Sequence, residues 1–438
     1  MPGAPRFDRA RLRRAASQIL RAGLEACEPE ALTQRALRRL ALREPRGRLL
    51  VIAAGKAAPA MARAAYGVLG DRIAEGIVVS PVPASVPVGF ELQLAGHPVP
   101  DAGGLRAAVA VESRLLGLGA DDLVLVLLSG GASALLPAPV AGISLDDKAR
   151  TTALLLRSGA TIHELNAVRK HLSRLKGGGL ARAARPARVV ALLLSDVVGD
   201  DTSVIASGPT APDPSTYATA LHTLSDNGLL AAVPAPVRRH LEAGAGGGRP
   251  ETPKPGDAIF RRVKNHVVGS GSVAIRAAAL EARRVGLRPE ILTTRLQGEA
   301  REVARVLVAI LRERAARPPA VLLAAGETTV TVRGTGRGGR NQELALSAAA
   351  VLEGFPGPAV VASLGTDGID GASDAAGGVA DDGSAARARG LDLAPIRDFL
   401  DRNDSWTFMA TLGDLIVTGP TGTNVGDLVV LLAGDKRG

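Results

Sequence analysis

The feature that most constrains the fold is an unbroken apolar run, Leu123–Leu128, which ends in a Gly-rich turn. Two acidic residues precede the run, and helix-forming residues follow the turn Ser129-Gly130-Gly131-Ala132-Ser133. A short apolar run without alternation is typical of a strand that is buried on both faces, as in a parallel sheet. The stretch therefore predicts a buried strand, a tight turn and a helix in direct succession.

The turn after this strand is a candidate anion-binding site. A strand, a Gly-rich turn and a helix start bring backbone N–H groups together, and the helix dipole also favours an anion there. We therefore expect Ser129, Gly130, Gly131 and Ser133 to bind the anionic group of a substrate or the phosphates of a nucleotide. A plain strand-to-helix turn without a ligand is the alternative.

Alternating apolar runs and helical segments recur along the chain. In the first half, such runs lie at residues 48–53, 76–80, 92–100 and 188–194. Alternating strands and helices over this length predict an α/β fold with a doubly wound parallel sheet. In the second half, strands are expected at residues 289–292, 320–325, 359–364 and 428–432. The alternating stretch within Thr328–Val332 predicts an antiparallel or edge strand, so we expect a mixed sheet there.

The length of 438 residues suggests two or three domains. Residues 244–258 are dense in Gly and Pro and have no apolar periodicity, which predicts a linker. We therefore expect an N-terminal Rossmann-like domain over residues 1–243. A C-terminal α/β domain with a mixed sheet is expected over residues 259–438.

The formal net charge of +10 could indicate a nucleic-acid partner. However, the arginines are spread through the predicted helices without a block of like charges, and aromatic residues, which stack on bases, make up only 2%. We therefore expect no nucleic-acid partner. The single cysteine excludes an internal disulfide framework, and no apolar window is long enough to span a membrane. These features predict a soluble cytoplasmic protein.

Two charged residues follow predicted strands. Lys56 lies where the first strand ends and a helix begins, at an edge where open parallel sheets bind ligands. Its surroundings are not a Walker loop, since Ala57 replaces the Ser or Thr that holds magnesium. Lys56 either binds a ligand or is a solvated turn lysine. Asp196 follows the strand 188–194, where metal ions and catalytic carboxylates are usually placed.

Two further turns in the first half are candidates for phosphate binding. Lys176-Gly177-Gly178-Gly179 ends a helix on which Asn166, Arg169, Lys170 and Arg174 can share one face. The three glycines allow close approach of a ligand to the backbone. A basic solvated face with a glycine cap is the alternative. Ser207 and Gly208 belong to a rigid turn that ends in Pro209.

The second half has its own candidates. Arg340 and Asn341 begin a helix after a Gly- and Arg-rich loop, and arginine is suited to bidentate binding of carboxylate or phosphate. A disordered basic loop is the alternative. Asp367 follows the strand 359–364 in a series of Asp-Gly turns, and carboxylates there could hold Mg²⁺. The same series could form turns without a metal.

Gly269-Ser270-Gly271-Ser272-Val273-Ala274 matches the dinucleotide fingerprint G-x-G-x-x-A between a strand and a helix. The acidic residue expected after the next strand is missing. We therefore interpret the stretch as a tight turn, with nicotinamide dinucleotide binding as the less favoured alternative.

Taken together, the motifs resemble the glycerate 2-kinase family of the MOFRL type over nearly the whole chain. The resemblance rests on AGKA at 54–57, LSGGASALL at 128–136, NAVRKHLSRLKGGGLA at 166–181, LSDVVGDD at 194–201, IASGPT at 205–210, GGRNQELAL at 338–346, GTDGIDGASDAAGG at 365–378 and TGPTGTNVGDL at 418–428.

The resemblance implies ATP-dependent phosphorylation of D-glycerate at its 2-hydroxyl, which gives 2-phosphoglycerate. It implies two α/β domains with the site in the cleft between them, and a functional lysine and arginine, here Lys56 and Arg340. Members have also been labelled hydroxypyruvate reductases, so an NAD(P)H-dependent hydroxypyruvate reductase is the alternative function.

These considerations give a set of expected roles. Catalysis is assigned to Lys56, Arg340 and Asp196. Substrate binding is assigned to Lys56, Ser129, Gly130, Gly131, Ser133 and Arg340. Nucleotide binding is assigned to Lys176, Gly177, Gly178, Gly179, Ser207, Gly208, Asn341 and Glu327. Mg²⁺ is assigned to Asp196 and Asp367. Glycerate and ATP are the expected partners, and a homodimer remains open.

Overall fold

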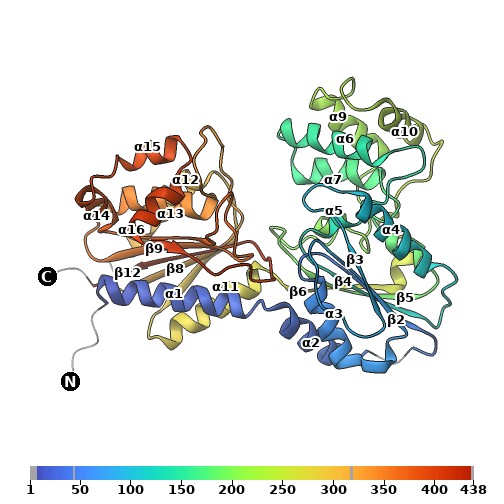
Figure 1. Ribbon diagram of the computed structural model, residues 1–438, viewed down its shortest axis with the longest axis horizontal. Helices are drawn as coiled ribbons and strands as arrows, with labels where there is room; N and C mark the ends of the chain where they lie inside the picture. The colour runs from blue at the N-terminus through green and yellow to red at the C-terminus, as the bar shows by residue number, and fades with distance from the viewer. Residues whose placement is uncertain (1–6, 43–44, 316–318, 436–438) are drawn as a thin grey trace. The chain divides into compact units, whose positions relative to one another are not determined.

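The computed structural model describes residues 7–42, 45–315 and 319–435, which form two compact units (Figure 1). Residues 29–195 and 200–268 make up the first, which we call the parallel-sheet unit. Residues 7–28, 196–199 and 269–435 make up the second, which we call the mixed-sheet unit.

The parallel-sheet unit is built on a six-stranded sheet in the order β3-β2-β1-β4-β5-β6. Its strands are β1 (Leu49–Ala54), β2 (Glu75–Ser80), β3 (Phe90–Leu94), β4 (Leu123–Leu128), β5 (Arg188–Leu194) and β6 (Val263–Gly269). Strand β1 pairs in parallel with β2 and with β4, and every side chain of β4 is buried. This order is that of the doubly wound fold, whose connections change direction between β1 and β4. The predicted fold class of this half is confirmed.

Helices flank the sheet and form a separate cluster within the same unit (Figure 1). The helices are α2 (Pro29–Leu40), α3 (Ala58–Leu69), α4 (Ala102–Leu115), α5 (Ala132–Leu135), α6 (Leu145–Arg157), α7 (Ile162–His171), α8 (Gly179–Ala183), α9 (Tyr217–Asp226) and α10 (Ala235–Ala245), with 3₁₀ turns at Gly70–Arg72, Ile205–Ser207 and Ala258–Arg262. Apolar residues of α6, α7, α9 and α10 pack into one small core. The starts of α6 and α7 are fixed by capping boxes, Ser144 with Asp147 and Thr161 with Glu164, each of which satisfies backbone N–H groups that the helix leaves unpaired.

The mixed-sheet unit has a second six-stranded sheet in the order β11-β10-β9-β12-β8-β7. Its strands are β7 (Pro289–Leu296), β8 (Ala320–Gly326), β9 (Ala359–Gly365), β10 (Gly377–Asp381), β11 (Leu415–Ile416) and β12 (Asp427–Ala433). The last strand in sequence, β12, is inserted antiparallel between β8 and β9, whereas β7 and β8 pair in parallel. The predicted mixed sheet is confirmed.

Helices cover both faces of this sheet (Figure 1). They are α1 (Arg9–Glu25), α11 (Gly271–Arg284), α12 (Ala300–Arg314), α13 (Arg340–Leu352), α14 (Ser384–Gly390), α15 (Ile396–Asp401) and α16 (Ser405–Leu412). Helices α1 and α11 lie side by side on one face, and α12 and α13 lie on the other. The core beneath α12 and α13 consists of Ala, Leu and Val side chains with one phenylalanine, Phe355.

The N-terminal helix belongs to a different unit from the one expected. Helix α1 lies in the mixed-sheet unit, although residues 1–243 were predicted as one domain. Its buried side chains Leu12 and Ile19 face this unit, and Arg13 pairs with Asp381 and Asp414 at 2.6 Å each. An amphipathic helix pattern shows which face is buried but not which sheet it covers, so the sequence could not place it.

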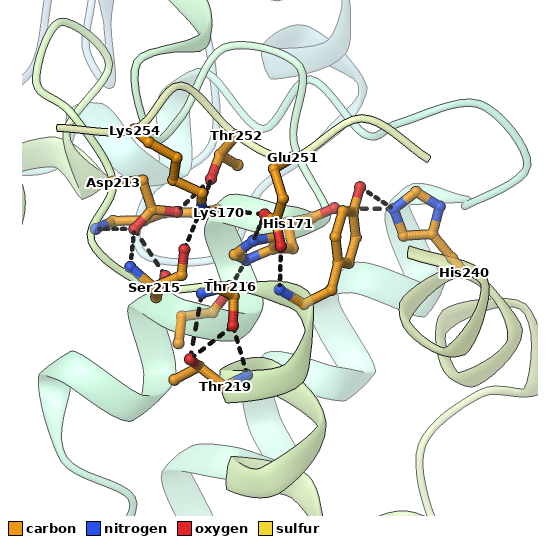
Figure 2. A network of polar contacts seen from close by, with 12 residues as sticks. Lys170, His171, Asp213, Ser215, Thr216, Thr219, His240, Glu251, Thr252 and Lys254 are labelled. Carbon is orange, nitrogen blue, oxygen red and sulfur yellow. Dashed lines mark hydrogen bonds and ion pairs between the residues drawn. The ribbon is translucent and has the colours of Figure 1, made fainter. Parts of the chain in front are cut away.

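The stretch predicted as a linker is part of the parallel-sheet unit. Helix α10 extends to Ala245, and the residues after Pro250 are held by polar contacts (Figure 2). Glu251 accepts from the backbone N–H of Tyr217 and pairs with His171 at 2.9 Å, while Thr252 donates to Asp213. Glycine and proline here mark an ordered loop whose hydrogen bonds, to both backbone and side chains, do not form a strand ladder.

One predicted strand is wrong. The alternating stretch Thr328–Val332 makes only an isolated bridge, between Thr329 and Glu299, and the backbone N–H of Thr331 donates to the Glu299 carboxylate. Within the described parts of the chain, no helix is both long and apolar enough to cross a membrane.

Candidate active site

The carboxyl ends of β1 and β4 lie side by side at the point where the strand order of the sheet changes direction. Doubly wound folds bind ligands at this point. Lys56 follows β1, and its backbone N–H donates to the carbonyl of Gly130 at 2.9 Å. The N–H of Ala57 donates to Ser129 Oγ at 3.0 Å. Only glycine fits at position 55, because φ is +126° and a Cβ atom would lie 2.2 Å from Ser129 Oγ.

The Gly-rich turn has the predicted local structure of strand, turn and short helix. The N–H groups of Gly130 and Gly131 make no hydrogen bond to the described residues. Gly131 has φ +89°, and a Cβ atom there would lie 3.0 Å from the His97 ring. The turn therefore offers unpaired donors beside Lys56, although its binding of an anion stays a prediction.

His97 joins this group from the segment after β3. Burial and the positive charge of Lys56 both lower the pKa of the His97 imidazole. His97 is therefore neutral at pH 7 and close enough to Lys56 to sense its charge.

In the turn Lys176–Gly179, predicted to bind phosphate, several donors form hydrogen bonds within the protein. The N–H groups of Gly177 and Gly178 donate to the carbonyls of Ser207 and Gly208, and Lys176 Nζ donates to the carbonyls of Ser133 and Leu136. These bonds hold the two loops together and support the Ser129–Ser133 turn. Direct contact of Lys176–Gly179, Ser207 or Gly208 with a nucleotide stays a prediction.

The mixed-sheet unit has a second group of charged residues, centred on Arg340. The Arg340 guanidinium makes a bidentate pair with Asp427, at 2.7 and 2.9 Å, and an ion pair with Glu327 at 3.1 Å. Burial acts to lower the pKa of Arg340, but the bond to Asp427 and its charge outweigh it and raise the pKa. Arg340 is thus a fixed positive charge at the start of α13.

Asn341 and the start of α13 are fixed by Asp370. The Asp370 carboxylate accepts from the backbone N–H groups of Asn341 and Gln342 at 3.1 and 2.8 Å. Gly339 has no side chain to cap the helix, and a Cβ atom there would lie 2.4 Å from Asp370. Asn341 Nδ2 also donates to Asp427 at 3.0 Å. Asp370 therefore takes over the role of the N-cap.

Glu327, which pairs with Arg340, also lies near the carboxylates of Asp196 and Asp367. Partial burial, with the negative charges of Asp427, Asp196 and Asp367, raises the pKa of Glu327 to about 6 against the opposing effect of Arg340. Asp196 Oδ2 accepts from Asn424 Nδ2 at 3.2 Å, and Asp367 Oδ1 accepts from the N–H of Ile369. The carboxylates in this acidic cluster outnumber its one arginine.

This acidic cluster suits a hard cation in part. Among the residues that the structure describes, no three His, Cys, Asp or Glu side chains are arranged to enclose a metal ion. Mg²⁺ needs no such enclosure, because it commonly takes one or two protein carboxylates and completes its shell with water and phosphate oxygens. The excess negative charge around Glu327 is consistent with such an ion.

The expected site residues therefore fall into two groups. The first, in the parallel-sheet unit, comprises Lys56, Ser129, Gly130, Gly131, Ser133, Lys176, Gly177, Gly178, Gly179, Ser207 and Gly208. The second, in the mixed-sheet unit, comprises Asp196, Glu327, Arg340, Asn341 and Asp367. Sequence reasoning missed Asp427, whose signal was a lone acidic residue beside an apolar run. It considered Asp370 only among the carboxylates after the strand 359–364 that could hold Mg²⁺, and not as the cap of α13. The predicted position of the site between two domains stays a prediction.

The G-x-G-x-x-A stretch lacks the setting of a dinucleotide site. Strand β6 before it belongs to the first sheet, whereas α11 after it packs against β7, β8 and α1 of the mixed-sheet unit. In the dinucleotide motif, the strand and the helix pack within one βαβ unit. Here the turn at Gly269 is the point where the chain passes from one unit to the other.

These features define a two-unit α/β protein with a cationic Gly-rich turn in one unit and an acidic cluster around an arginine in the other. Two family models match the chain: a domain of unknown function, DUF4147, over residues 15–242, and the MOFRL family over residues 320–427.

Known proteins resemble the chain over almost its whole length. A D-glycerate 2-kinase of Thermotoga maritima is 42% identical over 97% of this chain and 99% of its own. An Agrobacterium vitis protein provisionally named a hydroxypyruvate reductase is 44% identical over 96% of this chain and 95% of its own. The crystal structure of a Thermotoga maritima glycerate kinase matches with a TM-score of 0.87 at 41% identity, over 96% of this chain and 99% of that one. The chain belongs to the glycerate 2-kinase family, as its motifs predicted.

Proposed function

We propose that this protein transfers a phosphoryl group from ATP to the 2-hydroxyl of D-glycerate and releases 2-phosphoglycerate and ADP. Membership of the glycerate 2-kinase family supports a kinase that acts on glycerate. The observation that carries the proposal is the placement of Lys56 beside the unpaired N–H groups of Gly130 and Gly131, at the point where the sheet order changes direction. Cationic and N–H donors together suit an anionic substrate.

Phosphoryl transfer depends mainly on positioning and on neutralising the charge of the phosphate oxygens. Lys56 and Arg340 would bind the glycerate carboxylate and the phosphoryl group in transfer. Ser129, Gly130, Gly131 and Ser133 would bind the substrate through backbone and hydroxyl donors. Arg340 is suited to its role because Asp427 fixes its side chain.

Asp196 would orient the 2-hydroxyl or hold Mg²⁺, with Asp367 as the second carboxylate for the metal. When bound, Mg²⁺ would neutralise phosphate charge. Their proximity to Glu327, which raises its pKa, supports this assignment. Nucleotide binding by Lys176–Gly179, Ser207, Gly208, Asn341 and Glu327 belongs to the same proposal.

The direct test is incubation of the purified protein with D-glycerate, ATP and Mg²⁺, followed by ³¹P NMR. Formation of 2-phosphoglycerate would support the reaction and its position on the substrate together. If no phosphoglycerate forms while ATP remains intact, the proposal is wrong. Loss of NADH absorbance with hydroxypyruvate would then favour the reductase named for the Agrobacterium vitis relative.

Lys56→Ala tests the placement on which the proposal rests. Loss of the charge beside the Gly130–Gly131 turn is expected to lower kcat/KM for glycerate by about 10²-fold or more. Arg63→Ala is the control, since Arg63 lies on α3 with 43% of its side chain exposed. Steady-state kinetics with equal amounts of folded protein measure both variants. Wild-type kcat/KM in Lys56→Ala would exclude the role of Lys56.

A further inference from the structure

The parallel-sheet unit contains a group of basic residues, Lys148, Arg169 and Lys176, without a matching acidic residue. Lys148 Nζ donates to the carbonyls of Pro137 and Leu172, and Lys176 Nζ donates to those of Ser133 and Leu136. Within the described residues, none of the three forms an ion pair with a carboxylate. By contrast Lys170, next to Arg169 in sequence, pairs with Asp213 at 3.1 Å (Figure 2).

Burial without an acidic partner disfavours the charged forms of these side chains. Burial lowers the pKa of Arg169 to about 10. Burial and the positive charges of Lys148 and Arg169 lower the pKa of Lys176 well below its ordinary value. Charges held apart from water and near one another cost free energy of folding, and an anion at this position would recover part of it.

Arg169 keeps most of its hydrogen-bonding capacity. A guanidinium has five N–H donors. The structure gives Arg169 one partner, since Nη2 donates to Ser133 Oγ at 2.5 Å. The Arg169 guanidinium is largely buried, but Arg169 and Ser133 as whole residues keep partial exposure, through which a ligand can reach them. A planar guanidinium with unused donors can bind two oxygens of a phosphate group at once.

Ser133 is held in position by a chain of polar groups. Ser207 Oγ donates to Asn166 Oδ1 at 2.8 Å, so its only proton is used. Ser133 Oγ lies 2.9 Å from Ser207 Oγ, and its own proton must therefore point to Ser207. Asn166 Nδ2 is buried and has no partner in the described structure. The serine hydroxyls are thus ordered, with Ser133 turned to accept from Arg169.

We propose that Arg169, supported by Ser133 and the Gly130–Gly131 turn, binds a phosphate group, carried either by the nucleotide or by the phosphorylated product. This inference rests on the proposed function and adds to it a binding residue outside the expected set. The Arg169 guanidinium would donate hydrogen bonds to two phosphate oxygens, while the N–H groups of Gly130 and Gly131 would donate to a third.

The test uses Arg169→Lys and Arg169→Met in the full chain, with Arg157→Met as control. Arg157 is an exposed arginine at the end of α6 in the same unit. Isothermal titration calorimetry measures the Kd of ADP, of 2-phosphoglycerate and of inorganic phosphate. Thermal unfolding without ligand measures stability separately.

We expect Arg169→Lys to weaken binding of at least one of these ligands by about tenfold, and Arg169→Met by about 100-fold, because the bidentate contact and then the charge are lost. If only the binding of ADP is weakened, Arg169 binds a phosphate of the nucleotide. If only the binding of 2-phosphoglycerate is weakened, Arg169 binds the phosphate of the product. Arg157→Met should leave every Kd unchanged. Without ligand, Arg169→Met should unfold at the wild-type temperature or above it, since an unpaired buried charge is removed.

Unchanged Kd values in both Arg169 variants would overturn the inference. So would a lower unfolding temperature of Arg169→Met with unchanged Kd values, because Arg169 would then only stabilise the turn. The proposed function can fail separately. If the wild type binds ADP in an Arg169-dependent way but does not phosphorylate glycerate, the phosphate site stands and the proposed substrate is wrong.

Discussion

At the scale of single residues, the site is governed by charges whose partners the sequence does not reveal. Lys56 and Arg340 stand out in sequence because they occupy strand and helix ends beside glycines. The role of Asp427 at Arg340 and that of Asp370 at the start of α13 could not be recognised in this way, because each depends on contacts that only the fold creates. The sequence thus predicts the cationic side chains better than the carboxylates that orient them.

The coupling between Lys56 and His97 gives a prediction at this scale. Lys56→Met should raise the pKa of His97, because the positive charge that disfavours imidazolium is removed. The pKa should stay below the ordinary histidine value, since burial, the larger cause, remains. NMR titration of histidine-labelled protein measures it, with His97→Gln to assign the signal. Arg63→Met is the control and should leave the His97 pKa unchanged. An unchanged His97 pKa in Lys56→Met as well would show that Lys56 and His97 do not interact.

At the scale of elements, the strands were predictable and the assignment of helices to sheets was not. Strand β4 has the bounds expected from its apolar run, and β5 does too, because continuous burial leaves a continuous apolar signature. Helix α1 carries an equally clear pattern, yet its partner sheet is formed by the other end of the chain. The Thr328–Val332 stretch alternates, but the N–H of Thr331 donates to the Glu299 carboxylate and that of Thr328 to Asp427, instead of to a neighbouring strand.

The ion pairs of α1 can be tested through stability. Arg13→Ala removes one guanidinium from Asp381, which is fully buried, and from Asp414. Both carboxylates keep Arg387 as a partner, and Asp381 also keeps Arg9. We expect a loss of about 2 kcal/mol in the free energy of unfolding, measured by urea denaturation at pH 7.

Arg14→Ala is the matched control for this experiment. Arg14 is the next residue on α1 and is exposed, so a change within about 0.5 kcal/mol is expected. Equal stability of the two variants would mean that α1 is not held by these ion pairs.

At the scale of the whole molecule, the only cysteine reports on one unit. Cys27 is fully buried in the mixed-sheet unit, and burial raises the pKa of its thiol to about 12. Folded protein should therefore react with a thiol reagent far more slowly than unfolded protein, since the thiolate is the reactive form. Labelling across a urea series should follow the unfolding of this unit, with Cys27→Ala as the blank. Rapid labelling without denaturant would contradict the burial of Cys27.

The position of β12 has a consequence for biosynthesis. This strand lies in the interior of the second sheet, between β8 and β9, yet it follows every other strand of that sheet in the sequence. Helix α1 is synthesised before either sheet and cannot pack until the mixed sheet forms, whereas all strands of the first sheet are complete by Gly269. The nascent chain can therefore fold its parallel sheet early. The mixed sheet stays open in the middle until β12 has been synthesised, so a ribosome that stalls before β12 leaves exposed strand edges that favour aggregation.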